Sequence, residues 1–159
     1  MSSGTYSQIY IQLVFVVKSR QNFLKKEFRE EIFKYMSGII TAKGQKSIII
    51  NGVEDHVHLF IGLKPSMRLS DLVRDVKNNT TNFINEKQFL KSKFSWQIGY
   101  GAFSYSHSHI DNVYQYILKQ EEHHKKKSFK QEYMLLLKRF NIEFKEEYLF
   151  EFFDEEKVD

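Results

Sequence analysis

Two histidines, His56 and His58, stand two positions apart in the stretch DHVHLFIGL at residues 55–63. Its apolar, partly β-branched and aromatic composition predicts a strand. Because alternate residues of a strand point to the same face, the two imidazoles should stand together, about 7 Å apart at the backbone. That spacing suits a metal ion or a phosphate. Two polar residues on a half-solvated strand face have the same spacing, so this alternative stays open.

Tyr116 and Gln120 form a second pair, four positions apart, within a predicted helix over about 111–124. Residues with this spacing share one helix face, and Val113 and Ile117 would anchor that face to the protein. A tyrosine hydroxyl can act as a nucleophile in group transfer. An ordinary packed tyrosine with a satisfied hydroxyl gives the same pattern.

Few other residues near these pairs indicate chemistry. Beyond Asp55, no carboxylate cluster adjoins the histidines, and strand alternation predicts that the Asp55 side chain points away from His56. This argues against a hydrolase that activates water on a metal. The run EEHHKKK at 121–127 could be a metal tract or a phosphate clamp, but a solvated helix end explains it more simply. His107 and His109 are expected to have no catalytic role.

The elements that must position these residues follow the order β-α-β-β-α-β, and further helices come after them. This order predicts the ferredoxin-like split βαβ sandwich of the α/β (α+β) class. Its antiparallel sheet should carry helices on one face and leave the other face free for a ligand. Ser108 with Asp111, and Ser128 with Gln131, resemble capping boxes that open the later helices. The expected strands are 8–17, 46–53, 55–63 and 94–105, and the expected helices of the sandwich are 25–43 and 68–88.

The composition fits one domain over 1–150 and an acidic, flexible segment over 151–159. The chain has 159 residues and no cysteine, which excludes a disulfide framework, a cysteine zinc site, an iron–sulfur cluster and a thiol nucleophile. Residues 141–159 hold eight of the 20 acidic residues and two of the 24 basic ones, so residues 1–140 carry a net charge of +10. A basic body favours a polyanionic partner, although the composition bias of a low-GC genome, which favours lysine, gives similar counts. With no visible signal peptide or membrane span, we expect a cytoplasmic bacterial protein that joins the nucleoid when bound to DNA.

Three segments together resemble the IS200/IS605-type transposases, the single-tyrosine "HUH" family, in its IS200-like and REP-associated branch. They are EDHVHLFIGLKPSMRLSDLVRDVKNNTTNFIN, WQIGYGAFSYS, and VYQYILKQEEHH with the following FKQEYMLLLKRFNIEF. The resemblance spans about residues 6–150 and implies that His56 and His58 bind a metal. It further implies that Gln120 completes the metal site and that Tyr116 is the nucleophile.

The resemblance also implies a substrate and an assembly. The family binds single-stranded DNA with subterminal hairpins and cuts it by tyrosine attack. The cut leaves a 5′-phosphotyrosine link and a free 3′-OH, and the reverse reaction rejoins the strands. The resemblance implies a homodimer in which the tyrosine helix can complete a site across the dimer. A domesticated, non-catalytic module that binds single-stranded DNA or RNA is the alternative on the same fold.

The chemistry of these side chains agrees with that assignment. A tyrosine hydroxyl has a pKa near 10, so it needs help to attack at neutral pH. Two imidazoles and an amide oxygen are neutral ligands, which leave the full charge of a divalent ion for the phosphate. Mg²⁺ or Mn²⁺ is the expected ion, since the reaction is not redox, and Zn²⁺ could compete. Trp96 or Tyr100 could stack on unpaired bases, and the expected phosphate contacts are Lys18, Arg20, Arg68, Arg74 and Lys77.

Overall fold

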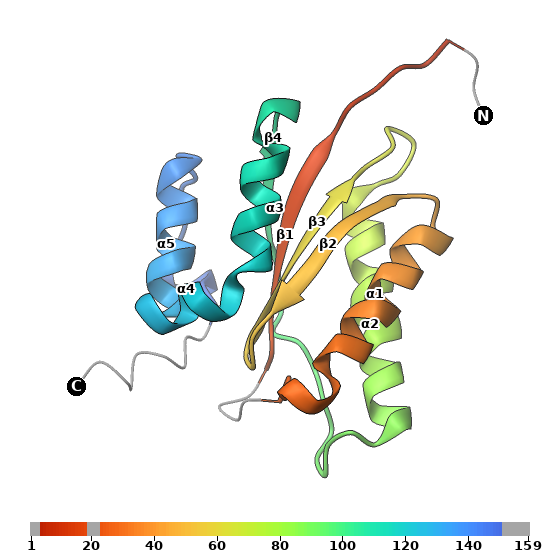
Figure 1. Cartoon of the computed structure of the whole chain (residues 1–159), viewed down its shortest axis with the longest axis vertical. Coiled ribbons are helices and arrows are strands. Elements are labelled where there is room, and N and C mark those ends of the chain that lie inside the picture. The colour runs from red at the N-terminus through yellow and green to blue at the C-terminus, as the bar shows by residue number, and fades with distance from the viewer. Residues whose placement is uncertain (1–3, 19–22, 151–159) are drawn as a thin grey trace.

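A four-stranded antiparallel sheet forms the centre of the molecule, with strand order β2-β3-β1-β4 (Figure 1). The computed structural model describes residues 4–18 and 23–150. The element order and sheet order are those of a ferredoxin-like sandwich, which confirms the predicted fold class. The strands are β1 (Tyr10–Val16), β2 (Lys46–Gly52), β3 (His56–Gly62) and β4 (Gly101–Tyr105). The helices are α1 (Lys26–Ala42), α2 (Leu69–Lys87), α3 (Ile110–Leu118), α4 (Gln120–Lys126) and α5 (Phe129–Arg139), with 3₁₀ turns at His107–His109 and Glu146–Tyr148.

One face of the sheet is covered by α1 and α2, and the main apolar core lies between them and the sheet (Figure 1). Val57, Leu59 and Ile61 of β3 are fully buried in this core, as their alternation with the histidines predicts. Leu13 and Phe15 of β1 join them from the neighbouring strand. The aliphatic side of β3 therefore fixes the histidines on the opposite face.

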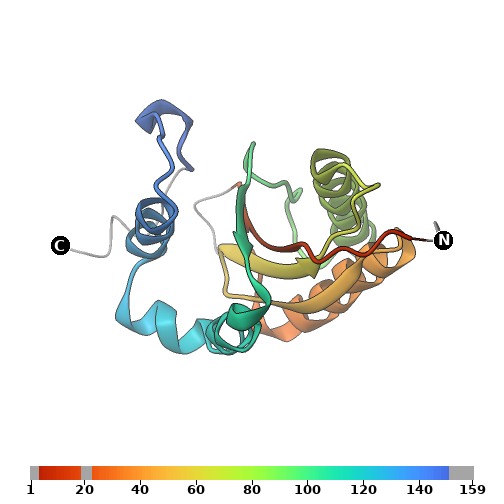
Figure 2. The ribbon, with the colours of Figure 1, turned by 90° about the horizontal axis from the view of Figure 1, so that it is seen from above.

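The opposite face is also covered, whereas the sequence pattern predicted that it would be free. Figure 2 shows α3 and α5 on the side of the sheet away from α1 and α2. Phe60 packs with Val113 and Ile117 of α3. A second cluster joins the β1 and β4 side chains to α5, and its buried members are Val14, Val16, Phe103, Phe129, Tyr133, Leu136, Leu137 and Phe150. Any site on this face is a pocket between layers and does not lie on an open platform.

The histidines sit at the start of β3, directly after the tight turn that joins β2 to β3. Val53 N donates to His56 O at 3.1 Å to close the turn. A Cβ added at Gly52 would lie only 2.2 Å from His56 O, so the close approach of the two strands requires glycine there. In the central pair of strands, His58 lies opposite Val14 and His56 opposite Val16.

The last strand is shorter than the predicted 94–105, because β4 begins only at Gly101. Gly99 adopts a positive φ of 87°, which interrupts the extended backbone. Trp96 forms an isolated bridge with Val17, and its ring packs against Phe15 and Phe94 in the core. Its side chain is 7% exposed, so stacking of Trp96 on an unpaired base is wrong for this fold.

The helices after β4 differ in part from the expected pattern. The Ser108 side chain does not cap α3. A 3₁₀ turn precedes this helix, and within it Ser106 Oγ bonds to His109 Nδ1 at 2.9 Å. The predicted helix to about 124 is interrupted at Lys119, which separates α3 from α4. The capping box at Ser128 and Gln131 is confirmed and opens α5. No helix in the described part of the chain combines the length and apolar character that crossing a bilayer needs.

Candidate active site

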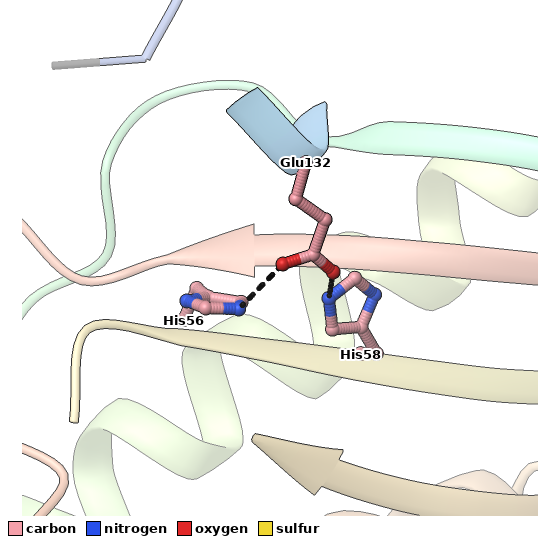
Figure 3. A group of neighbouring side chains, drawn as sticks. All are labelled: His56, His58 and Glu132. Carbon is pink, nitrogen blue, oxygen red and sulfur yellow. Dashed lines mark ion pairs between the residues drawn. The ribbon is translucent and has the colours of Figure 1, made fainter. Parts of the chain in front are cut away.

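His56 and His58 stand together on the covered face, with ring centroids 5.2 Å apart and both side chains fully buried. Figure 3 shows the two rings on β3 below the carboxylate of Glu132, which descends from α5. One nitrogen of each ring and one carboxylate oxygen lie within 4.8 Å of one another. The alternative, that these histidines lie on a half-solvated strand face, is therefore wrong.

His56 is held by a carboxylate from its own neighbour in the chain. Asp55 Oδ1 lies 2.8 Å from His56 Nδ1, and the ring stacks on Phe129 at 4.0 Å. The prediction that Asp55 points away from His56 is wrong, because Asp55 belongs to the turn before β3 and strand alternation does not apply to it. With Nδ1 bonded to Asp55, the His56 ring turns its Nε2 towards Gln120 and Glu132.

His58 is oriented from the other side by an amide. Gln12 Nε2 lies 2.9 Å from His58 Nδ1, and Tyr105 donates its hydroxyl to Gln12 Oε1 at 2.8 Å. His58 Nε2 forms an ion pair with Glu132 Oε1 at 2.8 Å. That contact is not aligned as a hydrogen bond, so His58 Nε2 has no hydrogen-bond partner among the described residues.

Glu132 is the site residue that the sequence pattern did not predict. Its Oε1 accepts hydrogen bonds from the Tyr116 hydroxyl and, at 3.3 Å, from Gln120 Nε2. Its Oε2 lies 3.7 Å from His56 Nε2. The absence of a further carboxylate near the histidines was therefore a wrong expectation. A signal did exist, since Glu132 lies on the buried face of α5, where an acid is unusual.

The electrostatics of the cluster follow from this shared carboxylate. Burial disfavours ionised Glu132, but the attraction of His58 and His56 and the bond from Tyr116 outweigh it and lower its pKa. Burial likewise disfavours charged His56, but Asp55 and Glu132 outweigh it and raise its pKa. For His58 burial prevails, and its pKa is lowered despite Glu132. The cluster therefore favours the ionised form of Glu132 and makes His56 easier to protonate than His58.

Tyr116 and Gln120 reach the site from two different helices. Gln120 Oε1 lies 3.2 Å from His56 Nε2, and its side chain is fully buried at the start of α4. Tyr116 lies on α3, half-buried, with its ring stacked on His123 at 4.5 Å. Burial and the negative charge of Glu132 raise the pKa of the Tyr116 hydroxyl. The structure thus brings the four predicted residues of the two pairs together within one chain.

A match to a known family accompanies this arrangement. Residues 5–120 match the family described as "Transposase IS200 like". The chain belongs to the IS200-like transposase family. The matched segment of this transposase includes both histidines, Tyr116 and Gln120, whereas α5 with Glu132 lies beyond it.

Two solved structures share the fold of this transposase. One is a protein from Deinococcus radiodurans described as a candidate transposase, with 22% identity, a TM-score of 0.61, and coverage of 76% of this chain and 96% of that one. The other is a REP-associated tyrosine transposase bound to a REP hairpin, with 12% identity, a TM-score of 0.54, and coverage of 79% and 74%. At these identities the likeness concerns the fold alone. A comparison with curated proteins gave no match.

The donors at this site fit a divalent metal. Among the described residues, His58 Nε2 is a buried nitrogen that has Glu132 Oε1 at 2.8 Å but no aligned hydrogen bond, and such an atom calls for an explanation. Imidazole nitrogens with carboxylate and amide oxygens form a mixed set that suits Mn²⁺ and tolerates Mg²⁺. Asp55 supplies His56 Nδ1 with the kind of outer bond that orients metal-binding imidazoles, whereas Gln12 Nε2 donates to His58 Nδ1.

The basic residues predicted to contact DNA lie away from this cluster. Lys18 is exposed just after β1, and its backbone N–H donates to Ser95 O at 2.9 Å. Arg68, Arg74 and Lys77 lie at or on α2, which covers the opposite face of the sheet. Arg74 pairs with Asp71 and Asp75, and Lys77 binds two backbone carbonyls. Arg20 falls outside the described residues. DNA contact by all five remains a prediction.

Proposed function

We propose that this transposase is a metal-dependent enzyme that nicks and rejoins single-stranded DNA by attack of Tyr116. The observation that carries the proposal is the hydroxyl of Tyr116, which donates to Glu132 in the same buried cluster as His56 and His58. The hairpin bound by the REP-associated relative supports hairpin-bearing DNA as the substrate here too.

In this proposal His56, His58 and Gln120 hold the metal, and Glu132 adds an oxygen ligand. A bound Mg²⁺ or Mn²⁺ would polarise the scissile phosphate and offset the charge that develops on it. The remaining steps belong to the protein. Tyr116 Oη bonds to phosphorus as the bond from phosphorus to the 3′ oxygen breaks, which gives a 5′-phosphotyrosine. The proton of the Tyr116 hydroxyl ends on the released 3′-OH, and the reverse attack of that hydroxyl rejoins the strand.

Glu132 and His123 have separate tasks around the nucleophile. His123 stacks on the Tyr116 ring and limits its rotation. Glu132 accepts a hydrogen bond from the Tyr116 hydroxyl, and this bond directs a lone pair of Tyr116 Oη away from Glu132. Because all of these groups come from one chain, we infer that each protomer can assemble its own site. A homodimer would bring two such sites together.

The test is covalent adduct formation with hairpin-bearing single-stranded DNA from the sequence that flanks the gene, in the presence of Mg²⁺ or Mn²⁺. Tyr116→Phe should abolish the adduct while hairpin binding persists. Tyr114→Phe is the matched control, because Tyr114 lies two positions away on the same helix and is exposed. An undiminished adduct from Tyr116→Phe would overturn the assignment. Hairpin binding without any adduct from the unmodified protein would establish the non-catalytic module instead.

A further inference from the structure

A cavity of about 450 Å³ opens directly beside Tyr116, between α3 and α5. This volume lies within the range of about 300–1,000 Å³ found for small-molecule sites. The floor of this side pocket is formed by Gln12, Tyr116 and Glu132, so it adjoins the nucleophile and the candidate metal ligands. The walls and rim include Tyr105, His109, Lys126, Lys127, Leu135 and Arg139.

The rim of the side pocket is strongly basic. Lys126, Lys127 and Arg139 are exposed there, and none of them forms an ion pair with a carboxylate of the described residues. Glu132 is the single acid of the lining, and its charge is already engaged by the histidines. These cations line a space that Glu132 does not neutralise, so the pocket favours an anion.

The walls of the side pocket suit a flat, partly apolar group. Val113 and Leu136 are buried and present aliphatic surface, and Leu135 is 48% exposed at the mouth. The rings of Tyr105 and His109 lie 6.3 Å apart on the facing side. Aromatic and aliphatic surfaces beside cations form the usual environment of an unpaired nucleotide, because the base stacks while the phosphate meets the cations.

We propose that the side pocket binds one nucleotide of the DNA strand next to the phosphate that Tyr116 attacks. The base lies between Tyr105, His109 and Leu135, and its phosphates meet Lys126, Lys127 and Arg139. The proposal rests on the proposed function, because it places the substrate strand of that reaction. It also gives the basic end of the 121–127 run a task beyond that of a solvated helix end.

The first experiment compares two double variants that remove two positive charges from the same two helices. Lys126→Ala with Arg139→Ala changes the pocket, whereas Lys125→Ala with Lys138→Ala changes exposed neighbours outside the pocket. The dissociation constant for hairpin-bearing single-stranded DNA is measured against salt concentration. Each lost phosphate contact reduces the slope of the log–log plot by about 0.7, so the pocket double should lose about 1.4 and the control double nothing. Equal slopes for the two doubles would overturn the proposal.

A second variant fills the pocket without removing charge. Leu135→Trp places a large ring at the mouth, at a position exposed enough to leave the fold intact. We expect adduct formation to slow at least tenfold while the affinity for Mn²⁺ is unchanged. An unchanged adduct rate would count against the pocket.

The two proposals fail in different ways. If no oligonucleotide forms an adduct with the unmodified protein, the proposed function fails, and the salt slopes still decide whether the pocket binds a strand. If the unmodified protein forms the adduct and all variants match it, only the pocket proposal fails.

Discussion

At the scale of single residues, the site depends on carboxylates that hold the histidines. Asp55 fixes His56 through Nδ1 and leaves Nε2 facing the cluster. Asp55→Asn should reduce the affinity for Mn²⁺ by about 10–100-fold, the usual effect of losing an outer-shell partner. Calorimetric titration measures it, and Glu54→Gln, one residue earlier in the same turn, is the control. Equal affinities in both variants would show that Asp55 does not orient His56.

Glu132 provides a second prediction at this scale. Glu132→Gln keeps the size of the side chain but removes the charge shared by the two histidines and Tyr116. If Glu132 is a metal ligand, the affinity for Mn²⁺ should fall more than tenfold, because amide oxygen is a weaker ligand than carboxylate. Calorimetry with Mn²⁺ is again the measurement. Unchanged or stronger binding would mean that Glu132 only neutralises the histidines in the absence of metal.

Four of the site residues could be predicted from the sequence, whereas Glu132 and Gln12 could not. His56 and His58 are separated by one residue, and Tyr116 and Gln120 by three residues, so each pair is visible as a local pattern. Glu132 and Gln12 meet the histidines only through the tertiary fold, and no local spacing connects them. A buried acid on the apolar face of a helix is the one clue that the chain offers for Glu132.

At the scale of elements, Lys77 connects α2 to the segment that leads into β4. Its ammonium donates to Gln97 O at 3.0 Å and Gly99 O at 2.5 Å, and it lies 5.3 Å above the Phe15 ring. These bonds hold the irregular stretch where the sequence pattern predicted a continuous strand. Alternating aromatic residues such as Phe94 and Trp96 imitate a strand, but Gly99 breaks the backbone between them and β4.

The burial of Lys77 also makes the stability of the fold depend on pH. Burial lowers the pKa of Lys77 from 10.5 to about 8. Between these values the unfolded chain keeps a proton that the folded chain releases, so the Lys77 contribution to stability rises with pH over that window. Urea unfolding at pH 7.5 and pH 9.5 tests this. Relative to Lys77→Met, the unmodified protein should gain stability at the higher pH, and parallel pH profiles would refute the effect.

At the scale of the whole molecule, the sandwich could be predicted because its strands and helices alternate in clear local patterns. The layer formed by α3 and α5 could not, because periodicity identifies an apolar helix face without naming the surface that it covers. Phe129 and Tyr133 look like any apolar stripe in the sequence, yet they close the face that carries the histidines.

Because this layer and the sheet hold the proposed metal ligands between them, a bound metal should stabilise the whole fold. Mn²⁺ at 100 times its dissociation constant contributes about 2.7 kcal/mol. For a domain of this length that corresponds to a rise in Tm of roughly 5–10 °C. Thermal unfolding with and without Mn²⁺ measures the shift. Tyr116→Phe should keep it and His58→Ala should lose it, and a shift of the same size in His58→Ala would place the metal elsewhere.

The distance along the chain between the site residues has a consequence for synthesis. His56 and Gln120 are 64 residues apart, and Glu132 follows later still. The ribosome releases β1, β2 and β3 long before α5, because synthesis proceeds from the N-terminus. A nascent chain therefore displays its two histidines before the tyrosine or the carboxylate exists. Premature termination after β4 would release a sheet without Tyr116, Gln120 and Glu132, so the proposed site can form only once α5 has been synthesised.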